Sequence, residues 1–209
     1  MKVLNYGSLN VDYVYSVDHI IVGGETQHSS KLEVFSGGKG LNQSIALAKA
    51  GVPVYHAGIV GTDGDILLEA CKEAGVNTKY IRRLPVKGGH TMIQVDKNAQ
   101  NCIILYGGTN QMQTKEFVDE VLADFGEGDY LILQNEINML DYIIDQAYEK
   151  KMKIVMNPSP FDDKLSTCDL SKVYLFLVNE IEGEQITGCK DKDQILDAMA
   201  AKFPNARFV

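Results

Sequence analysis

Residues 36–51 read SGGKGLNQSIALAKAG, a glycine-rich turn that leads into a run with helical periodicity. The apolar residues of this run recur at the spacing of one helix face, at Leu41, Ile45 and Ala48. Gly51 then provides a typical helix stop, and residues 31–35 upstream have the composition of a short strand. The stretch therefore predicts a strand, a tight glycine turn and a helix in direct succession.

This arrangement is suited to a polar or anionic ligand. Glycines allow the backbone to approach a bound group closely, and the start of a helix presents free N–H groups beside Lys39. Two nucleotide motifs do not fit. In an alignment on Gly38, Glu33 stands at the position where a P-loop has its first glycine. Gln43 stands at the position where a dinucleotide fingerprint has its third glycine. A glycine turn that only packs a helix on a sheet remains the structural alternative.

The composition restricts the class of partner. The chain has 209 residues, a net charge of −8 and no basic run longer than two residues, which argues against nucleic-acid and anionic-membrane partners. The four cysteines are widely spaced and no histidines cluster, so neither a zinc site nor a disulfide framework is expected. The N-terminus lacks a signal-peptide core and no apolar run approaches a bilayer span, so a cytoplasmic setting is expected.

Two segments have strand-like alternation without crossover helices between their strands. They are residues 13–35 and 91–106, and the second contains a polar turn typical of a β-hairpin. Such strands do not fit a parallel sheet. We therefore predict that the two segments form a small antiparallel lid over the glycine turn, within a single unit spanning residues 1–209.

The rest of the chain alternates strands and helices. The expected strands are residues 2–6, 54–60, 130–133, 153–156 and 173–178. The expected helices are residues 64–74, 114–124, 138–151, 180–187 and 191–203, and Asn138 is the expected N-cap of its helix. This alternation predicts an α/β fold with a doubly wound, mainly parallel sheet.

Six polar residues lie at or just past the ends of predicted strands. They are Asn10, Asp12, Glu136, Asn157, Asn179 and Glu182. Because right-handed crossovers make the strands parallel, their carboxyl ends share one edge of the sheet, where these side chains can meet the glycine turn. Turn-forming residues could produce two or three such positions by chance, but six favour a binding site.

These residues in this order resemble the ribokinase family of sugar kinases, also called the PfkB carbohydrate kinases. The similarity covers the whole chain and rests on NVD at residues 10–12, GGKGLNQ at 37–43, QNE at 134–136, NPSP at 157–160 and NEIE at 179–182. The glycine–lysine–asparagine segment is the most specific part, and its form is closest to ribokinase itself. The resemblance implies a ribokinase-like α/β fold.

The resemblance also implies sites for a sugar and for a nucleotide. On the sugar side, Asp12 would accept hydrogen bonds from hydroxyls, Asn10 would shape the same loop or add a contact, and Glu136 would hold the sugar from the opposite strand. The remaining members of this side would be Gly38 and Lys39, against the sugar ring, and Asn42, which would bind a hydroxyl from the start of the helix.

On the phosphate side, the resemblance assigns Asn179 and Glu182 to the organisation of Mg²⁺ and its waters, so that Glu182 would contact the metal indirectly. Asn157 would line the same nucleotide cleft. The implied cofactors are ATP and Mg²⁺, with a monovalent cation as a further candidate. Mg²⁺ is usually held through few carboxylates together with water and phosphate oxygens, which agrees with this assignment.

The chain departs from the family pattern at its C-terminal end. A second family signature, which supplies the catalytic base and an anion hole, is absent, so no catalytic base is expected before Val209. The sequence therefore predicts a fragment of a longer kinase that acts on a primary hydroxyl of a ribose-like sugar or a nucleoside. The alternative is a non-catalytic sugar-binding or nucleoside-binding remnant. Family members often dimerise through the lid, which makes a homodimer a candidate assembly.

Overall fold

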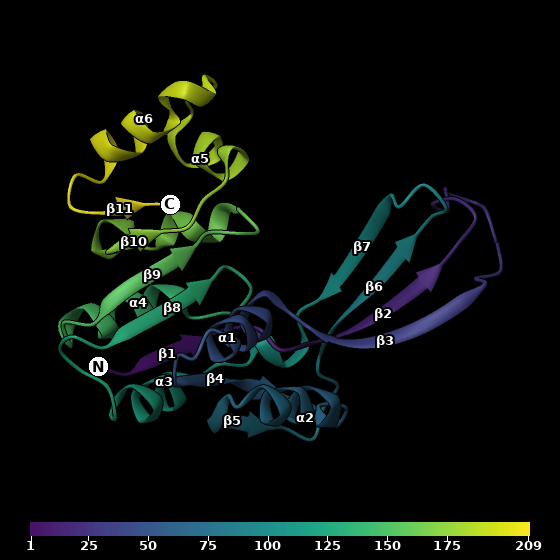
Figure 1. The fold of residues 1–209 in the computed structure, drawn as a ribbon, viewed down its shortest axis with the longest axis horizontal. Helices are drawn as coiled ribbons and strands as arrows, with labels where there is room; N and C mark the ends of the chain where they lie inside the picture. The colour runs from purple at the N-terminus through teal and green to yellow at the C-terminus, as the bar shows by residue number, and fades with distance from the viewer.

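A computed structural model describes all residues from Met1 to Val209. Its main sheet has seven parallel strands in the order β11-β10-β9-β8-β1-β4-β5 (Figure 1). These strands are β1 (Val3–Tyr6), β4 (Val54–Val60), β5 (Asn77–Arg83), β8 (Tyr130–Gln134), β9 (Lys153–Asn157), β10 (Leu175–Phe176) and β11 (Arg207–Phe208). The parallel sheet is confirmed, and its strands end on the side from which the lid projects.

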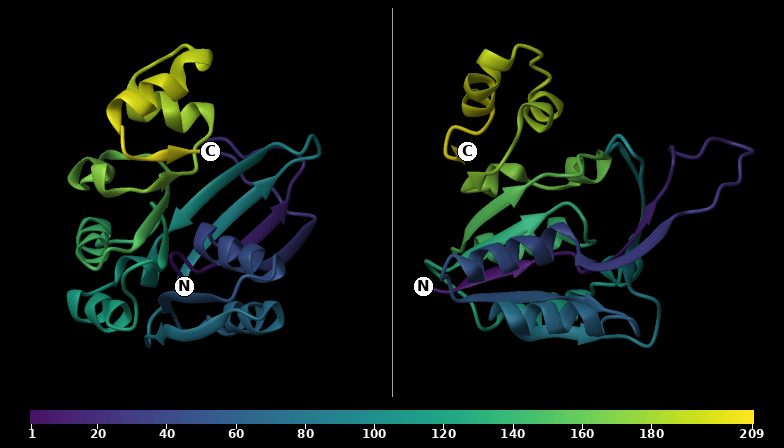
Figure 2. Two further views of the ribbon diagram at one scale, coloured as in Figure 1. Left: turned by 60° about the vertical axis from the view of Figure 1, so that its left-hand side comes forward. Right: turned by 45° about the vertical axis from the view of Figure 1, so that its right-hand side comes forward.

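Helices cover both faces of this sheet (Figure 2). They are α1 (Lys39–Lys49), α2 (Asp65–Ala74), α3 (Lys115–Leu122), α4 (Leu140–Glu149), α5 (Glu180–Thr187) and α6 (Ile195–Lys202). The larger apolar core lies on the side of α3 to α6, and a second core packs α1 and α2 against the opposite face. Because each strand between them is buried on both faces, the central strands are almost entirely apolar. The doubly wound α/β fold is therefore confirmed.

The lid is a four-stranded sheet in the order β3-β2-β6-β7. Its strands are β2 (Asn10–Ser16), β3 (Lys31–Gly37), β6 (Gly89–Val95) and β7 (Asn101–Tyr106). The two outer pairs are antiparallel, but β2 and β6 pair in parallel, so the prediction of a wholly antiparallel lid is wrong at its centre. Both β2 and β6 run outward from the main sheet, which gives them the same direction, and β3 and β7 return beside them.

Three local predictions differ from the structure. The edge strand β5, which carries charged residues, was not predicted, and the strand predicted at residues 173–178 is present only as the two residues of β10. Asn138 is not the N-cap of α4, because that position belongs to Met139. The side chain of Asn138 instead bonds the backbone of Gln113 at both its N–H and its carbonyl. Short 3-10 turns, including residues 108–111, complete the connections.

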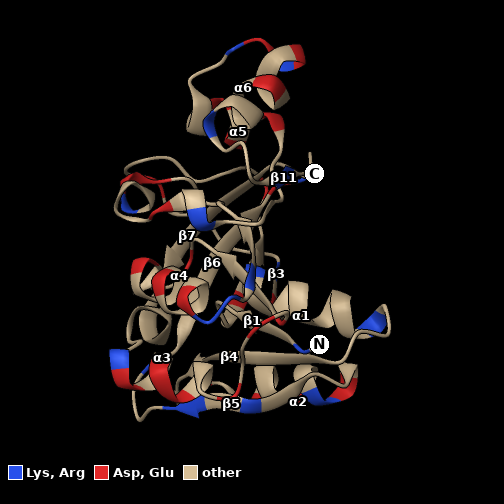
Figure 3. Cartoon of the chain, turned by 90° about the vertical axis from the view of Figure 1, so that its left-hand side faces the viewer, with Lys and Arg blue, Asp and Glu red and all other residues tan.

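Positions of basic and acidic residues alternate along the helices and loops without separating into regions of one sign (Figure 3). No helix is both long enough and apolar enough to cross a membrane.

Candidate sugar and nucleotide site

The start of α1 lies directly on the loop that follows β1. Gly38 is the N-cap residue, with a φ of 96° that favours glycine. A Cβ at Gly40 would lie 2.5 Å from the backbone nitrogen of Ser8 and 2.6 Å from the carbonyl carbon of Gly7. The two glycines therefore permit a contact between helix and loop that no other residue type allows.

Glu136 binds this helix start from the end of β8. Its Oε2 atom accepts a hydrogen bond from the backbone N–H of Lys39 at 3.0 Å and another from the hydroxyl of Ser8. The Ser8 oxygen in turn accepts from the N–H of Gly40 at 3.2 Å. A carboxylate at this position is stabilised by the positive end of the helix dipole. Glu136 and Lys39 are thus neighbours, although 97 residues separate them in the chain.

Asp12 lies at the base of the lid. Its Oδ1 atom accepts a hydrogen bond from the Thr91 hydroxyl at 2.6 Å, and a Cβ at Gly37 would collide with its carboxylate. Burial raises the pKa of Asp12, and the hydrogen bond from Thr91 opposes that rise. Asp12 keeps one carboxylate oxygen without a hydrogen-bond partner in the protein.

Asn10 is buried and fixed by a second amide. Its Oδ1 atom accepts from the Nδ2 of Asn110 at 2.7 Å, and the Oδ1 of Asn110 accepts from the N–H of Leu9 at 3.0 Å. Asn10 and Glu136 line one cavity of about 240 Å³, which also contacts Leu105 of the lid. The other residues of this cavity are polar, proline or glycine: Gly107, Asn110, Gln111, Asn135, Pro160, Asp162 and Lys164. A mostly polar cavity of this size is suited to a small ligand with several hydroxyls.

The sugar-side residues do not all form one hydrogen-bonded cluster. The side chain of Asn42 is exposed on the first turn of α1 and makes no hydrogen bond to the other members. The side chain of Lys39 is half-buried at the same helix start, and only its backbone bonds Glu136. Both side chains are therefore free to contact a ligand placed against the helix.

The phosphate-side residues meet at the ends of β9 and β10. The side chain of Asn179 accepts from the N–H of Glu182 at 2.9 Å, and Oε2 of Glu182 accepts from the N–H of Asn179 at 3.2 Å. The Nδ2 of Asn157 lies 3.4 Å from the same Oε2 atom. The Asn–Glu pair is thus a capping box of α5, and no hydrogen bond joins this group to the sugar-side residues.

The phosphate-side group offers few protein ligands for a metal ion. The chain has no group of three or more metal-ligating side chains. Glu182 is mostly buried, with one oxygen in the capping box and the other without a partner, which is compatible with one water-mediated contact to Mg²⁺. The site therefore fits Mg²⁺ only if phosphate oxygens and water supply the other ligands.

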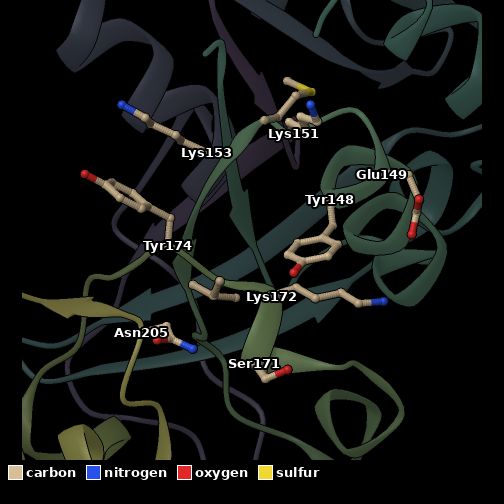
Figure 4. Close-up of a pocket in the computed structure, with 10 residues that line it drawn as sticks. Tyr148, Glu149, Lys151, Lys153, Ser171, Lys172, Tyr174 and Asn205 are labelled. Carbon is tan, nitrogen blue, oxygen red and sulfur yellow. The ribbon is translucent and has the colours of Figure 1, made fainter. Parts of the chain in front are cut away.

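The largest hollows of the molecule are elsewhere. One of about 520 Å³ lies at the opposite edge of the sheet, between the end of α4 and the starts of β9 and β10 (Figure 4). Lys153 there lies over the Tyr174 ring at 5.4 Å, and Lys172 lies over Tyr148 at 5.5 Å. Because ligands of open parallel sheets bind beyond the carboxyl ends of the strands, we assign the site to the smaller, polar cavity.

Several residues of the site were not predicted from the sequence, among them Ser8, Asn110 and Asp162. Ser8 follows β1 and its hydroxyl contacts Glu136, while Asn110 fixes Asn10 from a short 3-10 turn. Asp162 accepts from Nδ2 of Asn135 at 2.9 Å beside the cavity. The position of Ser8 directly after a buried strand was the one signal that could have identified it.

Sugar kinases are among the known proteins to which this chain is similar. The chain is 34% identical over 195 residues to a ribokinase of Staphylococcus aureus, which covers 90% of this chain and 64% of that protein. It is 28% identical over 193 residues to a deoxyribokinase of Salmonella typhimurium, covering 90% of this chain and 63% of the relative. The chain thus spans slightly less than two thirds of the length of these relatives.

A solved structure shows the same fold. The ribokinase from Cryptococcus neoformans in complex with ADP superposes with a TM-score of 0.78 at 29% identity, over 96% of this chain and 66% of that one. Residues 1–209 also match, over their whole length, the profile described as pfkB family carbohydrate kinase. The chain belongs to the pfkB family of carbohydrate kinases.

Proposed function

We propose that the protein is a sugar kinase that transfers the γ-phosphoryl group of ATP to a primary hydroxyl of a small ribose-like sugar or a nucleoside. The observation that carries the proposal is the polar cavity that Asn10 and Glu136 share under the lid. Ribokinase and deoxyribokinase relatives support a pentose as the substrate class.

Sugar binding would use groups that the protein holds in place beforehand. Asp12 has a free carboxylate oxygen beside the glycine turn, and Glu136 is fixed by the N–H of Lys39. The Lys39 and Asn42 side chains would contribute from the start of α1. Groups held in this way lose little conformational freedom when a ligand binds, which favours affinity for a small polar molecule.

The nucleotide would bind near Asn157, Asn179 and Glu182. Transfer of a phosphoryl group depends mainly on positioning and on neutralising charge, so a sugar clamp on one side and a Mg²⁺ organiser on the other suffice for this part of the site. Mg²⁺ bound with the nucleotide would neutralise phosphate charge. The need for a monovalent cation stays a prediction from the family resemblance.

The alternative function is non-catalytic binding of a sugar or nucleoside. A panel of pentoses, hexoses and nucleosides, assayed by ATP consumption with the full-length protein, separates the two. We expect sugar-dependent turnover to be fastest with ribose or a related pentose. Binding of a sugar without any ATP consumption would favour the alternative, and the absence of both binding and turnover would overturn the proposal.

We further propose that the lid forms a homodimer contact. Its ligand-side face carries exposed apolar residues, Phe35 on β3 and Ile103 and Leu105 on β7. An exposed apolar sheet of this kind commonly pairs with another subunit. Light scattering should give the mass of a dimer, and the Ile103→Glu variant should give a monomer. A wild-type protein that is monomeric at micromolar concentration would contradict this contact.

A further inference from the structure

Four fully buried polar side chains lie between the sheet and α1, beneath the sugar-side residues. Nε2 of Gln134 donates to Oδ1 of Asn5 at 2.9 Å, and Nδ2 of Asn5 donates to the Ser44 hydroxyl at 2.9 Å. The Ser44 oxygen lies 2.7 Å from Nδ1 of His56. These residues come from β8, β1, α1 and β4, and none has measurable exposure. We call them the buried relay.

Two groups bond the Ser44 hydroxyl within the buried relay. Its oxygen accepts from Nδ2 of Asn5 and lies 2.7 Å from Nδ1 of His56, and the tautomer of the imidazole determines which of these two atoms donates in the second contact. Burial lowers the pKa of His56 to about 4, with the Gly7 backbone opposing this effect. The imidazole is therefore neutral near pH 7, and the relay is a fixed support.

The buried relay also holds the two segments that flank the sugar site. Nδ2 of Asn5 donates to the Gly40 carbonyl at 2.7 Å, and Nε2 of Gln134 donates to Oε1 of Gln43 at 2.7 Å. Gly40 and Gln43 lie on either side of Asn42 in α1, and Gln134 precedes Glu136 by two residues. The same four side chains thus connect the start of α1 to the end of β8.

Packing alone does not require polar groups at these positions. Apolar side chains of similar volume would fill the space without the cost of removing amides and an imidazole from water. The buried relay leaves Nε2 of His56 and Oε1 of Gln134 without hydrogen-bond partners, but the bonds that it does make restrict the relative placement of the segments that they join. The placement is sensitive here, since the start of α1 contacts the Gly7–Ser8 backbone without clearance.

We propose that Asn5, Ser44, His56 and Gln134 are positioning residues for sugar binding. They hold the first turn of α1 and the end of β8 at the separation that the sugar requires, and they do not touch the ligand. The ligand class in this proposal rests on the proposed function, whereas the positioning of α1 rests on the hydrogen bonds alone.

The test compares relay variants with a matched control in the full-length protein. Ser44→Ala and His56→Phe remove the hydroxyl–imidazole bond, whereas His56→Asn keeps an acceptor near the position of Nδ1. Tyr6→Phe is the control, because it removes a buried hydroxyl bond, to Gln113, from the opposite face of the same strand as Asn5. Ribose and ATP affinities are measured by calorimetry, together with the melting temperature.

We expect Ser44→Ala and His56→Phe to weaken ribose binding about tenfold or more, the effect of disturbing one or two buried hydrogen bonds, with ATP binding changed less than about twofold. His56→Asn should recover most of the ribose affinity, and Tyr6→Phe should lower the melting temperature without weakening ribose binding. Folded Ser44→Ala and His56→Phe proteins with wild-type ribose affinity, or with equal losses for both ligands, would overturn the proposal.

Amide hydrogen exchange separates this inference from the proposed function. The N–H of Leu41 donates to the Ser8 carbonyl at 3.0 Å, so its exchange reports the contact between α1 and the loop. Ser44→Ala should accelerate this exchange at least about tenfold relative to Tyr6→Phe, whichever sugar the protein binds. Unchanged exchange overturns the positioning role, whereas a wild-type protein without ribose affinity overturns the ligand class only.

Discussion

Asp12 shows how a single carboxylate can be prepared for hydroxyl recognition. One of its oxygens is occupied by Thr91, the other has no protein partner, and the adjacent Gly37 leaves the carboxylate room to lie over the glycine turn. Burial raises its pKa, so its charged form is lost at a higher pH than that of an exposed aspartate. We therefore place Asp12 among the binding groups of the site.

The separate roles of Asp12 and Glu182 are testable with two alanine variants. Asp12→Ala should weaken sugar binding about tenfold or more, since an unpaired buried hydroxyl partner costs roughly 1–3 kcal/mol, while ATP binding changes little. Glu182→Ala should mainly weaken the binding of Mg²⁺·ATP and change the sugar affinity little. Calorimetric titration of both ligands against both variants gives the comparison. Equal losses of both ligands in both variants would contradict the division of the site.

His56 predicts a pH dependence of stability. Its pKa is about 4 in the folded protein against 6.5 for an ordinary histidine, so below about pH 6.5 the unfolded chain takes up a proton that the folded protein does not. The free energy of unfolding should therefore fall as the pH decreases from about 6.5 to 4. Denaturant titrations at pH 7 and pH 5 give the decrease in the free energy of unfolding between these two pH values. We expect this decrease to be about 2 kcal/mol larger in the wild type than in the His56→Asn variant. Equal losses would mean that His56 is not desolvated.

Some of the site residues could be predicted from the sequence because they lie within a few residues of the end of a buried strand. Asn10 and Glu136 stand at such positions, and the structure places both in one cavity. Asn110 carries no such signal, because it lies in a short 3-10 turn after the lid and reaches Asn10 across 100 residues. The buried relay could not be predicted from the sequence either, since a histidine or a serine within an apolar run gives no indication of its hydrogen-bond partner.

At the level of elements, periodicity identified the strands and helices that bury an apolar face. It failed for β5, whose alternation includes Lys79, Arg82 and Arg83 because the strand lies at the edge of the sheet. It also gave the wrong direction for one lid pair. Strand direction in the lid is decided by where β2 and β6 leave the main sheet, and local sequence contains no information about that.

The contact between α1 and the loop after β1 gives a prediction at this scale. Gly40→Ala should lower the free energy of unfolding by about 1–3 kcal/mol, because the new Cβ would overlap the Gly7–Ser8 backbone. The same displacement of the helix start should weaken sugar binding. Gly126→Ala is the control, because a Cβ there meets no atom within 4 Å. Chemical denaturation measures both variants. Equal stability of the two variants would show that the helix has room to move.

The whole molecule combines a doubly wound parallel sheet with a lid, and the proposed sugar-side and phosphate-side residues lie near the carboxyl ends of the strands of that sheet. The chain spans slightly less than two thirds of the length of its ribokinase and deoxyribokinase relatives. The family signature that would supply the base and the anion hole is absent from residues 1–209. The parallel sheet and the placement of helices on both faces followed from the βα alternation, whereas the order of the strands could not be predicted from it.

We predict that residues 1–209 alone have no measurable kinase activity. General-base catalysis and anion stabilisation each contribute orders of magnitude in rate, and the family signature expected to supply both does not occur in residues 1–209. The measurement is ribose-dependent ATP turnover by the purified 209-residue polypeptide, with the full-length protein as control. Turnover comparable to that of the control would require a base among the residues that we describe as binding groups.

The most direct test of the central claim is the identity of the bond that forms. The full-length protein is incubated with ATP, Mg²⁺ and ribose, and the product is examined by phosphorus NMR with proton coupling. We predict a new phosphomonoester whose phosphorus couples to two protons of one CH₂ group, as expected for phosphate on a primary hydroxyl. Release of inorganic phosphate alone, or a phosphoester on a secondary hydroxyl, would contradict the account.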